Sequence, residues 1–459
     1  MRKYLALSVV ASTLLMAGGD IAPVEPVVAT EADYGEVFGQ FRTFYIDRTY
    51  SGIKNENRNS LATGGYIGYK TPDFNGLTAA VAVYGVYGFE IHDMSIEDDL
   101  ANNWANYDPS LTGRDGENYA FIGEEYLNYV LDNTNIKAGR QRLDTPLIGA
   151  DDARMLPNLF EAAVVTNTDI EDTTMTLAHV TRETTGTFSN IYNDAYGLGF
   201  ASGYGAGTTL AQSGDFVNMG TVALGHIDFN NDGSTDNKND GVTAASVIYK
   251  GFDGLTLQAW DYYAYDILNA VYLQADYGWT CRLNENVKMN ASAQYINQSD
   301  VGDALAGKVD SDYWGVKLGA SLGALSAYAA YSQTGESDGT TSGGIITPWG
   351  GMPAFTQGMV TRHQFFSDTD SWKVAGTYKL NELLGEDVSA TVFYTEFDIG
   401  ATNSYDYGTA WTASESGWDI QYNVASVKGL NLRARANYPR DFKNGLDWDE
   451  YRLIVNYNF

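Results

Sequence analysis

The 459-residue chain contains a single cysteine, Cys281, so it has no intramolecular disulfide. It also has few basic residues, 28 lysines and arginines against 58 acidic residues, which gives a net charge of −30. This balance argues against nucleic-acid binding, which requires a basic patch or stripe. Proline is scarce at 9 residues, whereas glycine (49) and tyrosine (33) are abundant. Abundant tyrosine and glycine with little proline favour an all-β fold.

Beyond the N-terminus, the sequence lacks any apolar run near the roughly 20 residues that a membrane-spanning helix needs. Residues 1–18 combine Arg2 and Lys3, a short apolar run and small residues, which predicts a cleaved secretory signal peptide. The alternative, a membrane anchor, requires a longer run. Residues 19–34 contain proline and acidic residues without periodicity, and we expect a flexible periplasmic leader there.

Catalytic and cofactor motifs are also missing. The four histidines form no H-x-x-x-H pair, no G-x-S-x-G motif occurs, and the glycine-rich segment 197–207 lacks the lysine of a phosphate loop. We therefore predict neither enzymatic activity nor a cofactor. A catalytic triad assembled from distant residues is the alternative left open.

What the sequence does contain is regular alternation of apolar and polar residues, as in the C-terminal segment DEYRLIVNYNF, where Ile454 is the one apolar exception on the polar parity. One parity holds Tyr451, Leu453, Val455, Tyr457 and Phe459, and the other holds Glu450, Arg452, Asn456 and Asn458. This period of two is typical of a β-strand with one apolar face and one polar face.

Similar segments recur along residues 35–459, many with Tyr or Trp at the end of the apolar face. Short links alternate with long polar connections, for example 131–134 and then 335–368. Short periplasmic turns, long extracellular loops and aromatic strand ends predict one transmembrane antiparallel β-barrel of about 18 strands, with 16 to 20 defensible. A soluble β-sandwich, which also alternates, is the alternative. A closed barrel must also pair its last strand with its first, which we expect around 36–46.

The alternation breaks at residues 144–159, where we predict a constriction loop folded into the pore. Long loops inside a compact fold are often functional, and two prolines would stiffen this one. An ordinary surface loop is the alternative. The candidate constriction residues are Asp144, Thr145, Pro146, Asp151, Asp152, Arg154 and Pro157.

Basic residues lie on the polar parity of several predicted strands, opposite the apolar face. They cannot face lipid, where a charge at mid-depth costs about 2–4 kcal/mol. We therefore predict that they line the pore and favour anions; pairing with loop carboxylates is the alternative. These residues are Lys288, Lys317, Lys373, Arg433, Arg435 and Arg452.

The segment 228–240 resembles a calcium loop in its opening residues Asp228, Asn230, Asp232 and Asp236. Its twelfth position is Asn239 rather than the bidentate glutamate that such loops use, and no helical pattern flanks it. An acidic extracellular turn is therefore the preferred interpretation, and we predict no metal site.

The chain resembles the OprD-type outer-membrane porins. The resemblance lies in Lys137-x-Gly139, in Asp144-Thr145-Pro146 and in the D-x-R-x-x-P motif of 152–157 before Phe160. It continues through 260–266, 306–310, 429–435 and the C-terminal strand. It implies a monomeric 18-stranded porin for small solutes, often carboxylates, guided by a row of arginines. The chain departs from the family in its strong acidity and in having lysines where arginines are expected.

The expected function is an outer-membrane porin through which small hydrophilic solutes diffuse, with a preference for anions such as small carboxylates. The alternative is a structural or adhesive barrel whose acidic extracellular loops bind partners or divalent cations. The expected partners are outer-membrane lipid, lipopolysaccharide, the barrel-assembly machinery and the solutes, with no nucleic acid. By resemblance to outer-membrane proteins, the terminal aromatic Phe459 is an assembly signal.

Overall fold

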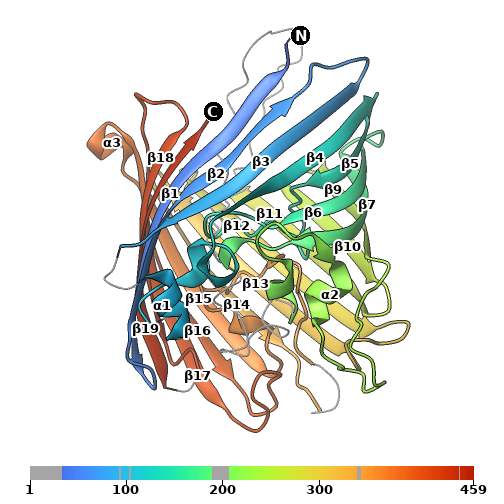
Figure 1. Cartoon of the computed structure of the whole chain (residues 1–459). Helices are drawn as coiled ribbons and strands as arrows, with labels where there is room; N and C mark the ends of the chain where they lie inside the picture. The colour runs from blue at the N-terminus through green and yellow to red at the C-terminus, as the bar shows by residue number, and fades with distance from the viewer. Residues whose placement is uncertain (1–33, 92–94, 103–104, 189–205, 339–342, 444) are drawn as a thin grey trace, which may run out of the picture.

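The computed structural model describes residues 34–91, 95–102, 105–188, 206–338, 343–443 and 445–459. Within these ranges one antiparallel sheet closes on itself (Figure 1). Its strands are β1 (Glu36–Gly52), β2 (Asn57–Lys70), β3 (Leu77–Phe89), β4 (Tyr119–Leu131), β5 (Thr134–Gln141), β6 (Leu159–Asn167), β7 (Thr173–Thr184), β8 (Val217–Asn218), β9 (Val242–Phe252) and β10 (Leu255–Ala264). They continue with β11 (Leu268–Thr280), β12 (Val287–Asp300), β13 (Asp310–Leu322), β14 (Leu325–Thr334), β15 (Thr369–Lys379), β16 (Asp387–Ile399), β17 (Trp411–Asn423), β18 (Leu430–Arg440) and β19 (Leu446–Asn458).

Of these strands, β8 is a two-residue segment that pairs only with β7, so the wall consists of eighteen strands, as predicted. The seam is the pairing of β1 with β19, which runs from Gln40 opposite Asn458 to Gly52 opposite Leu446. Backbone hydrogen bonds of 2.9 and 3.1 Å between Gly39 and Phe459 extend it to the last residue. Closure is required because hydrocarbon cannot satisfy the backbone groups of an open sheet edge.

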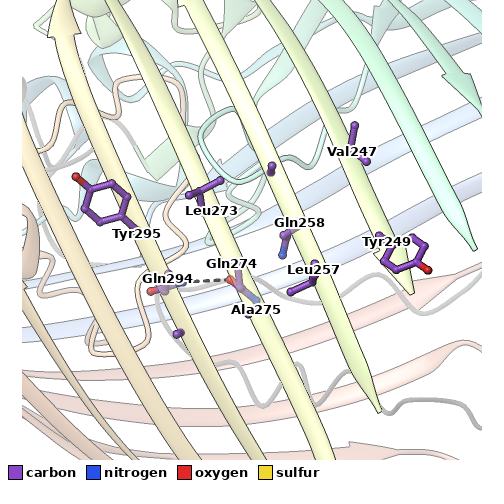
Figure 2. A pocket seen from close by; sticks show the side chains of 11 residues that line it. Val247, Tyr249, Leu257, Gln258, Leu273, Gln274, Ala275, Gln294 and Tyr295 are labelled. Atoms are coloured by element: carbon purple, nitrogen blue, oxygen red, sulfur yellow. Dashed lines mark hydrogen bonds between the residues drawn. The ribbon is translucent and has the colours of Figure 1, made fainter. Parts of the chain in front are cut away.

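Side chains alternate between the two faces of the wall as the sequence predicts. On β19, Leu453 is 58 % exposed on the outward face, whereas Glu450 and Arg452 are buried on the inner face. Over β9–β12 the outward face carries a shallow hollow lined by Val247, Leu273 and other apolar side chains (Figure 2). The hollow contains no charged residue. Two of its lining residues, Gln274 and Gln294, lie on the inner parity of their strands and are joined by a 3.2 Å hydrogen bond.

The connections differ sharply between the two ends of the barrel. Two residues join β4 to β5, β9 to β10 and β13 to β14, whereas the opposite end bears the connections 90–118, 142–158, 185–241 and 335–368. β1 begins and β19 ends at the short-turn end of the barrel (Figure 1). The described part of the connection 185–241 contains β8 and the short helix α2 (Met219–Leu224) rather than wall strands.

Several long connections fold inward and fill part of the barrel. All six residues of α2 are buried, and four of them, Met219, Val222, Ala223 and Leu224, pack in one apolar cluster with Ile148, Trp349 and inner-face residues of the wall. The other short helices are α1 (Ile96–Ala101) and α3 (Asn381–Leu384). Across the described ranges, every helix is too short or too polar to cross a membrane.

A charge placed on the outward face should destabilise the barrel more than the same charge on the inner face. Leu318 is 54 % exposed on the outward face of β13, and Leu318→Arg should lower the free energy of unfolding by about 2–4 kcal/mol. Ser326→Arg, on the inner face of β14, is the control and should change it much less. Denaturant titration of protein folded into lipid vesicles measures both. Equal losses would contradict the assignment of the two faces.

Candidate pore constriction

The predicted constriction loop crosses the barrel interior. Between β5 and β6, the backbone N–H of Leu147 donates to the hydroxyl of Tyr262 on β10 at 3.3 Å. The N–H of Gly149 donates to the carbonyl of Trp349 at 3.0 Å. Leu147 and Ile148 are buried in the large interior cluster. The loop therefore lies against other interior segments and not on the outer surface.

Most charged residues of this loop are buried in ion pairs. The carboxylate of Asp152 accepts from Arg42 on β1 at 2.6 and 3.0 Å and from Arg142 at 3.4 Å. Although burial opposes ionisation, these guanidinium groups hold the pKa of Asp152 below its ordinary value. Asp151 accepts from Arg362 at 3.0 Å. There burial outweighs the guanidinium and raises the pKa of Asp151.

The remaining predicted residues of the loop have other surroundings. Arg154 is buried and lies 3.4 Å from Glu450 on β19 and 3.3 Å from the hydroxyl of Ser110. The side chain of Asp144 is 58 % exposed, and it accepts from the N–H of Ala150 at 3.2 Å. Thr145 closes a turn through two bonds to Ile148. Pro146 is half-buried, whereas Pro157 is buried. Among these charged residues, Asp144 is therefore the one that meets solvent.

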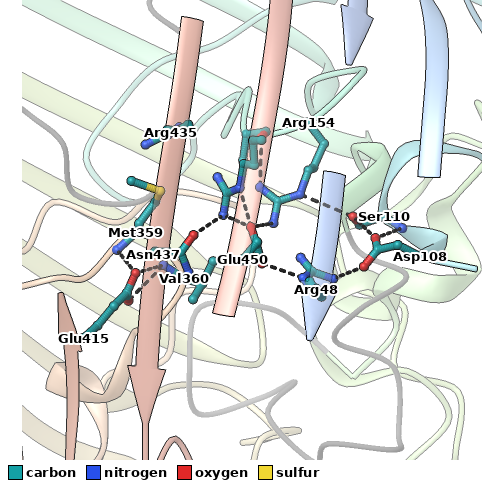
Figure 3. A network of polar contacts seen from close by, with 12 residues as sticks. Arg48, Asp108, Ser110, Arg154, Met359, Val360, Glu415, Arg435, Asn437 and Glu450 are labelled. Carbon is teal, nitrogen blue, oxygen red and sulfur yellow. Dashed lines mark hydrogen bonds and ion pairs between the residues drawn. The ribbon is translucent and has the colours of Figure 1, made fainter. Parts of the chain in front are cut away.

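A second inward loop, residues 343–366, was missed by the sequence reasoning. The carboxylate of Glu415 on β17 accepts backbone N–H bonds from Met359 at 3.0 Å, Val360 at 3.2 Å and Thr361 at 2.8 Å (Figure 3). The indole of Trp349 donates to the carbonyl of Met219 at 3.0 Å. The sequence feature that indicates this loop is the apolar run at 345–355, which would be exposed to water in an ordinary extracellular loop.

Arginines gather on the inner face of three adjoining strands, β18, β19 and β1. The three predicted arginines are buried there, and Arg42 and Arg48 of β1 join them. The carboxylates around them are Asp108, Asp152, Asp419 and Glu450. Parity reading of 36–46 could have found Arg42, because Phe41 and Thr43 flank it on the outward face. We call these five arginines, together with Arg154 and the four carboxylates, the seam cluster.

The ion pairs of the seam cluster are unequal. Arg433 contacts Asp419 at 2.5–3.0 Å, and Arg48 contacts Glu450 and Asp108 at 2.5 Å each (Figure 3). Arg435 lies 3.2 Å from Asp419, yet none of its three nitrogens has a hydrogen-bond partner among the described residues. Arg435 stands directly opposite Arg452 in the strand pairing. With six guanidinium groups against four carboxylates, the cluster has an excess of positive charge.

The predicted lysines lie on the inner face but not together. Lys373 is buried and donates to the carbonyl of Gln357 at 2.5 Å, which also holds the second loop. The ammonium group of Lys317 lies 4.5 Å above the ring of Phe355. Lys288 is exposed beside a short turn and donates to Thr280 at 2.8 Å. Lys288 and Lys317 therefore line the short-turn half of the barrel, away from the seam cluster.

The acidic loop 228–240 is built from hydrogen-bonded turns. Asp228 accepts from the backbone N–H groups of Asp232 and Gly233 at 3.1 and 3.0 Å, and Asp232 accepts from Ser234 at 2.7 Å. Throughout the ranges that the structure describes, His, Cys, Asp and Glu side chains form no group of three that could hold a metal ion.

Removing the carboxylate of Glu415 should release the second loop. Its three charge-assisted bonds are each worth about 1.5–3 kcal/mol, so Glu415→Ala should loosen residues 343–366 and enlarge the pore. Single-channel current should become larger and noisier. Glu396→Ala, which removes an outward carboxylate on β16, is the control. Unchanged current in Glu415→Ala would contradict this role.

Acid should loosen the same loop through His363. This side chain is buried against the rings of Phe366 and Phe442, both at 4.7 Å, and its Nε2–H donates to the Phe442 carbonyl at 2.5 Å. Burial lowers its pKa from 6.5 to about 4. Between pH 6.5 and 4 the opened loop accepts a proton on His363, whereas the closed loop does not. The stability of the closed loop is therefore full above about pH 6.5 and decreases by roughly 3 kcal/mol as the pH falls to 4.

Hydrogen exchange of residues 343–366 between pH 7.5 and 4, corrected for intrinsic rates, measures this loss. Protection should fall below pH 6.5, and it should fall less in His363→Gln. His226→Gln, which changes an exposed histidine, should leave the acid effect intact. Protection independent of pH would refute the role of His363.

Comparison with known proteins places this geometry in context. The family model described as outer membrane porin, OprD family, matches residues 34–459. Three Pseudomonas aeruginosa structures have a similar fold. OpdK with vanillate has 17 % identity and TM-score 0.71, over 93 % of this chain and 100 % of that one. OccK9 (OpdG) has 19 % identity and TM-score 0.71, over 92 % of this chain and 97 % of that one. OpdL has 17 % identity and TM-score 0.67, over 93 % of this chain and 98 % of that one. No curated protein sequence matches the chain significantly.

Proposed function

Since the chain belongs to the OprD family of outer membrane porins, a channel for small solutes, we propose that its pore favours anions and takes up small carboxylates. The proposal concerns the solute. The family and the fold support an outer-membrane β-barrel channel, as the sequence predicted.

The buried guanidinium of Arg435 carries this proposal. It lacks a hydrogen-bond acceptor among the described residues and faces Arg452 across the strand pair. Like charges directly opposite on adjacent strands are destabilising, and Asp419, the carboxylate 3.2 Å from Arg435, is shared with Arg433, so the buried charge of Arg435 is only partly compensated. A passing anion relieves both costs. A carboxylate suits the site well because it accepts two parallel bonds from one guanidinium.

The two inward loops give the arginines their selectivity in this proposal. Asp152 anchors the first loop to Arg42, and Asp151 joins it to Arg362 of the second. In this proposal, a solute that enters the pore passes close to the seam cluster. Asp144, Thr145 and Pro146 would form the solvent-facing side of the first loop. Lys288 and Lys317 would then attract the anion toward the periplasmic end.

One solved relative supports a carboxylate solute. That structure is of OpdK with vanillate, and vanillate is an aromatic carboxylate. Rings also line the inner wall of this chain, where Tyr66 stacks on Tyr84 with centroids 4.7 Å apart. The alternative function, an adhesive barrel whose acidic loops bind partners or divalent cations, has no comparable feature in its favour.

Further proposals concern targeting and assembly. Residues 1–18 would be a cleaved signal peptide and residues 19–34 a leader, with 35–459 as the barrel domain; the first 33 residues lie outside the described ranges. Phe459 would be the signal read by the barrel-assembly machinery. Its ring is 40 % exposed on the outward face and stacks on Tyr457. Lipopolysaccharide would surround the extracellular end. No enzymatic step is proposed.

Removing a positive charge from the seam cluster should lower the preference for anions, and removing a negative charge should raise it. Arg435→Gln should reduce the ratio of carboxylate to amine entry on the order of tenfold, because one charge near the solute is worth over 1 kcal/mol there. Asp419→Asn should raise the ratio. Arg440→Gln, an exposed arginine paired with Asp449 at the rim, is the control. Swelling of protein-loaded liposomes measures entry, and equal ratios in all variants would refute anion preference.

A further inference from the structure

A polar hollow lies on the outward wall of the barrel over β4–β7. It has a volume of about 430 Å³, and its charged or titratable lining residues are Glu125, Arg140, Glu161 and His179. Its other lining residues include the small residues Gly139 and Ala163. It is separate from the seam cluster and unrelated to the solute.

The strand pairing places this hollow on the outward face. Arg140 stands opposite Glu125 and Glu161. On the same faces of these strands, Leu127 and Ile136 are 58 % and 43 % exposed. The charges are therefore on the side of the wall that meets the membrane.

Along their strands, Arg140 and Glu161 also lie at a distance from the periplasmic turns at which β13 still has apolar outward residues. Arg140 follows the first residue of β5 by six positions, and Glu161 precedes the last residue of β6 by six. At the equivalent position on β13, six before Leu322, the outward residue is Val316, and Trp314 follows two positions further. The apolar band is thus shorter over β5 and β6 than over β13, and a charged row replaces its upper part.

The cause is the early end of β5. Its last pairings are Arg140 with Glu125 and Gln141 with Phe160, after which the chain turns inward. Above this level β4 lacks a partner strand on one side. The guanidinium of Arg140 donates to the carbonyl of Ile122 there at 3.4 Å and lies 4.3 Å from the ring of Phe216.

The ion pairs in the hollow leave one guanidinium group and one carboxylate accessible to a ligand. Glu161 is shared by two arginines, at 3.0 Å from Arg140 and 3.6 Å from Arg182, and the Arg182 side chain is 55 % exposed. Glu125 is exposed, and its carboxylate has no hydrogen bond or ion pair among the described residues. His179 is already engaged, with Nδ1 at 3.0 Å from the hydroxyl of Thr243.

We propose that this hollow binds the headgroup of a membrane lipid that carries a phosphate beside a primary ammonium group. The phosphate would accept from Arg140 and Arg182, since guanidinium groups bind phosphate strongly. The ammonium would donate to Glu125. A zwitterionic headgroup matches the two signs of the hollow, whereas a purely anionic one leaves Glu125 unpaired and repelled. Lipid is the occupant because the hollow is small, concave and set in the membrane-facing wall.

Native mass spectrometry of the detergent-solubilised full chain tests this proposal. Phosphatidylethanolamine should be retained about tenfold more than phosphatidylcholine, which lacks N–H donors, and about tenfold more than phosphatidylglycerol, which lacks the cation. Glu125→Gln should abolish the preference over phosphatidylglycerol. Arg182→Gln should weaken retention about tenfold while leaving the wall contacts of Arg140 in place.

Arg440→Gln is the matched control, because it removes an ion-paired arginine from β18, a strand that does not line the hollow. It should leave retention unchanged. Equal retention of the three lipids, or equal loss in Arg182→Gln and Arg440→Gln, would overturn the proposal. Channel selectivity does not enter this readout, so the proposed solute and the lipid site fail or succeed separately.

Discussion

The carboxylate of Glu450 is the contact on which most of the interior depends. It receives Arg48 from β1, Arg452 from its own strand and Arg154 from the first inward loop. One side chain thus joins the two strands that close the barrel to the first inward loop. Removing one partner from a buried ion pair of this kind typically costs about 3–5 kcal/mol. The interior is therefore held in one arrangement by charge pairing as well as by apolar packing.

A single irregularity of the wall has consequences on both faces. Because β5 ends at Gln141, its chain is available to cross the interior as the first loop, where Asp152 meets Arg42. For the same reason the outward wall lacks a strand at that level, and Arg140 and Glu161 occupy the hollow that remains. The first inward loop and the proposed lipid site thus arise from the same structural feature.

The wall could be predicted from sequence because a strand's faces are set by parity alone. Trp314, Val316 and Leu318 lie outward as expected, and Arg452 lies inside. The interior could not be predicted in the same way. That Glu415 anchors the second loop, or that Arg42 meets Asp152, depends on contacts between segments more than 50 residues apart. Composition identified the first loop as unusual, but it could not show that most of its charges are paired and buried.

The central claim is that charge-anchored loops leave a narrow pore beside an excess of guanidinium groups. Single-channel recording of the wild-type protein in a planar bilayer, under a salt gradient, tests it most directly. The account predicts small, discrete conductance steps, well below those of an unobstructed bore of eighteen strands, and a reversal potential on the anion side. A conductance typical of an open bore, or a reversal potential on the cation side, would contradict it.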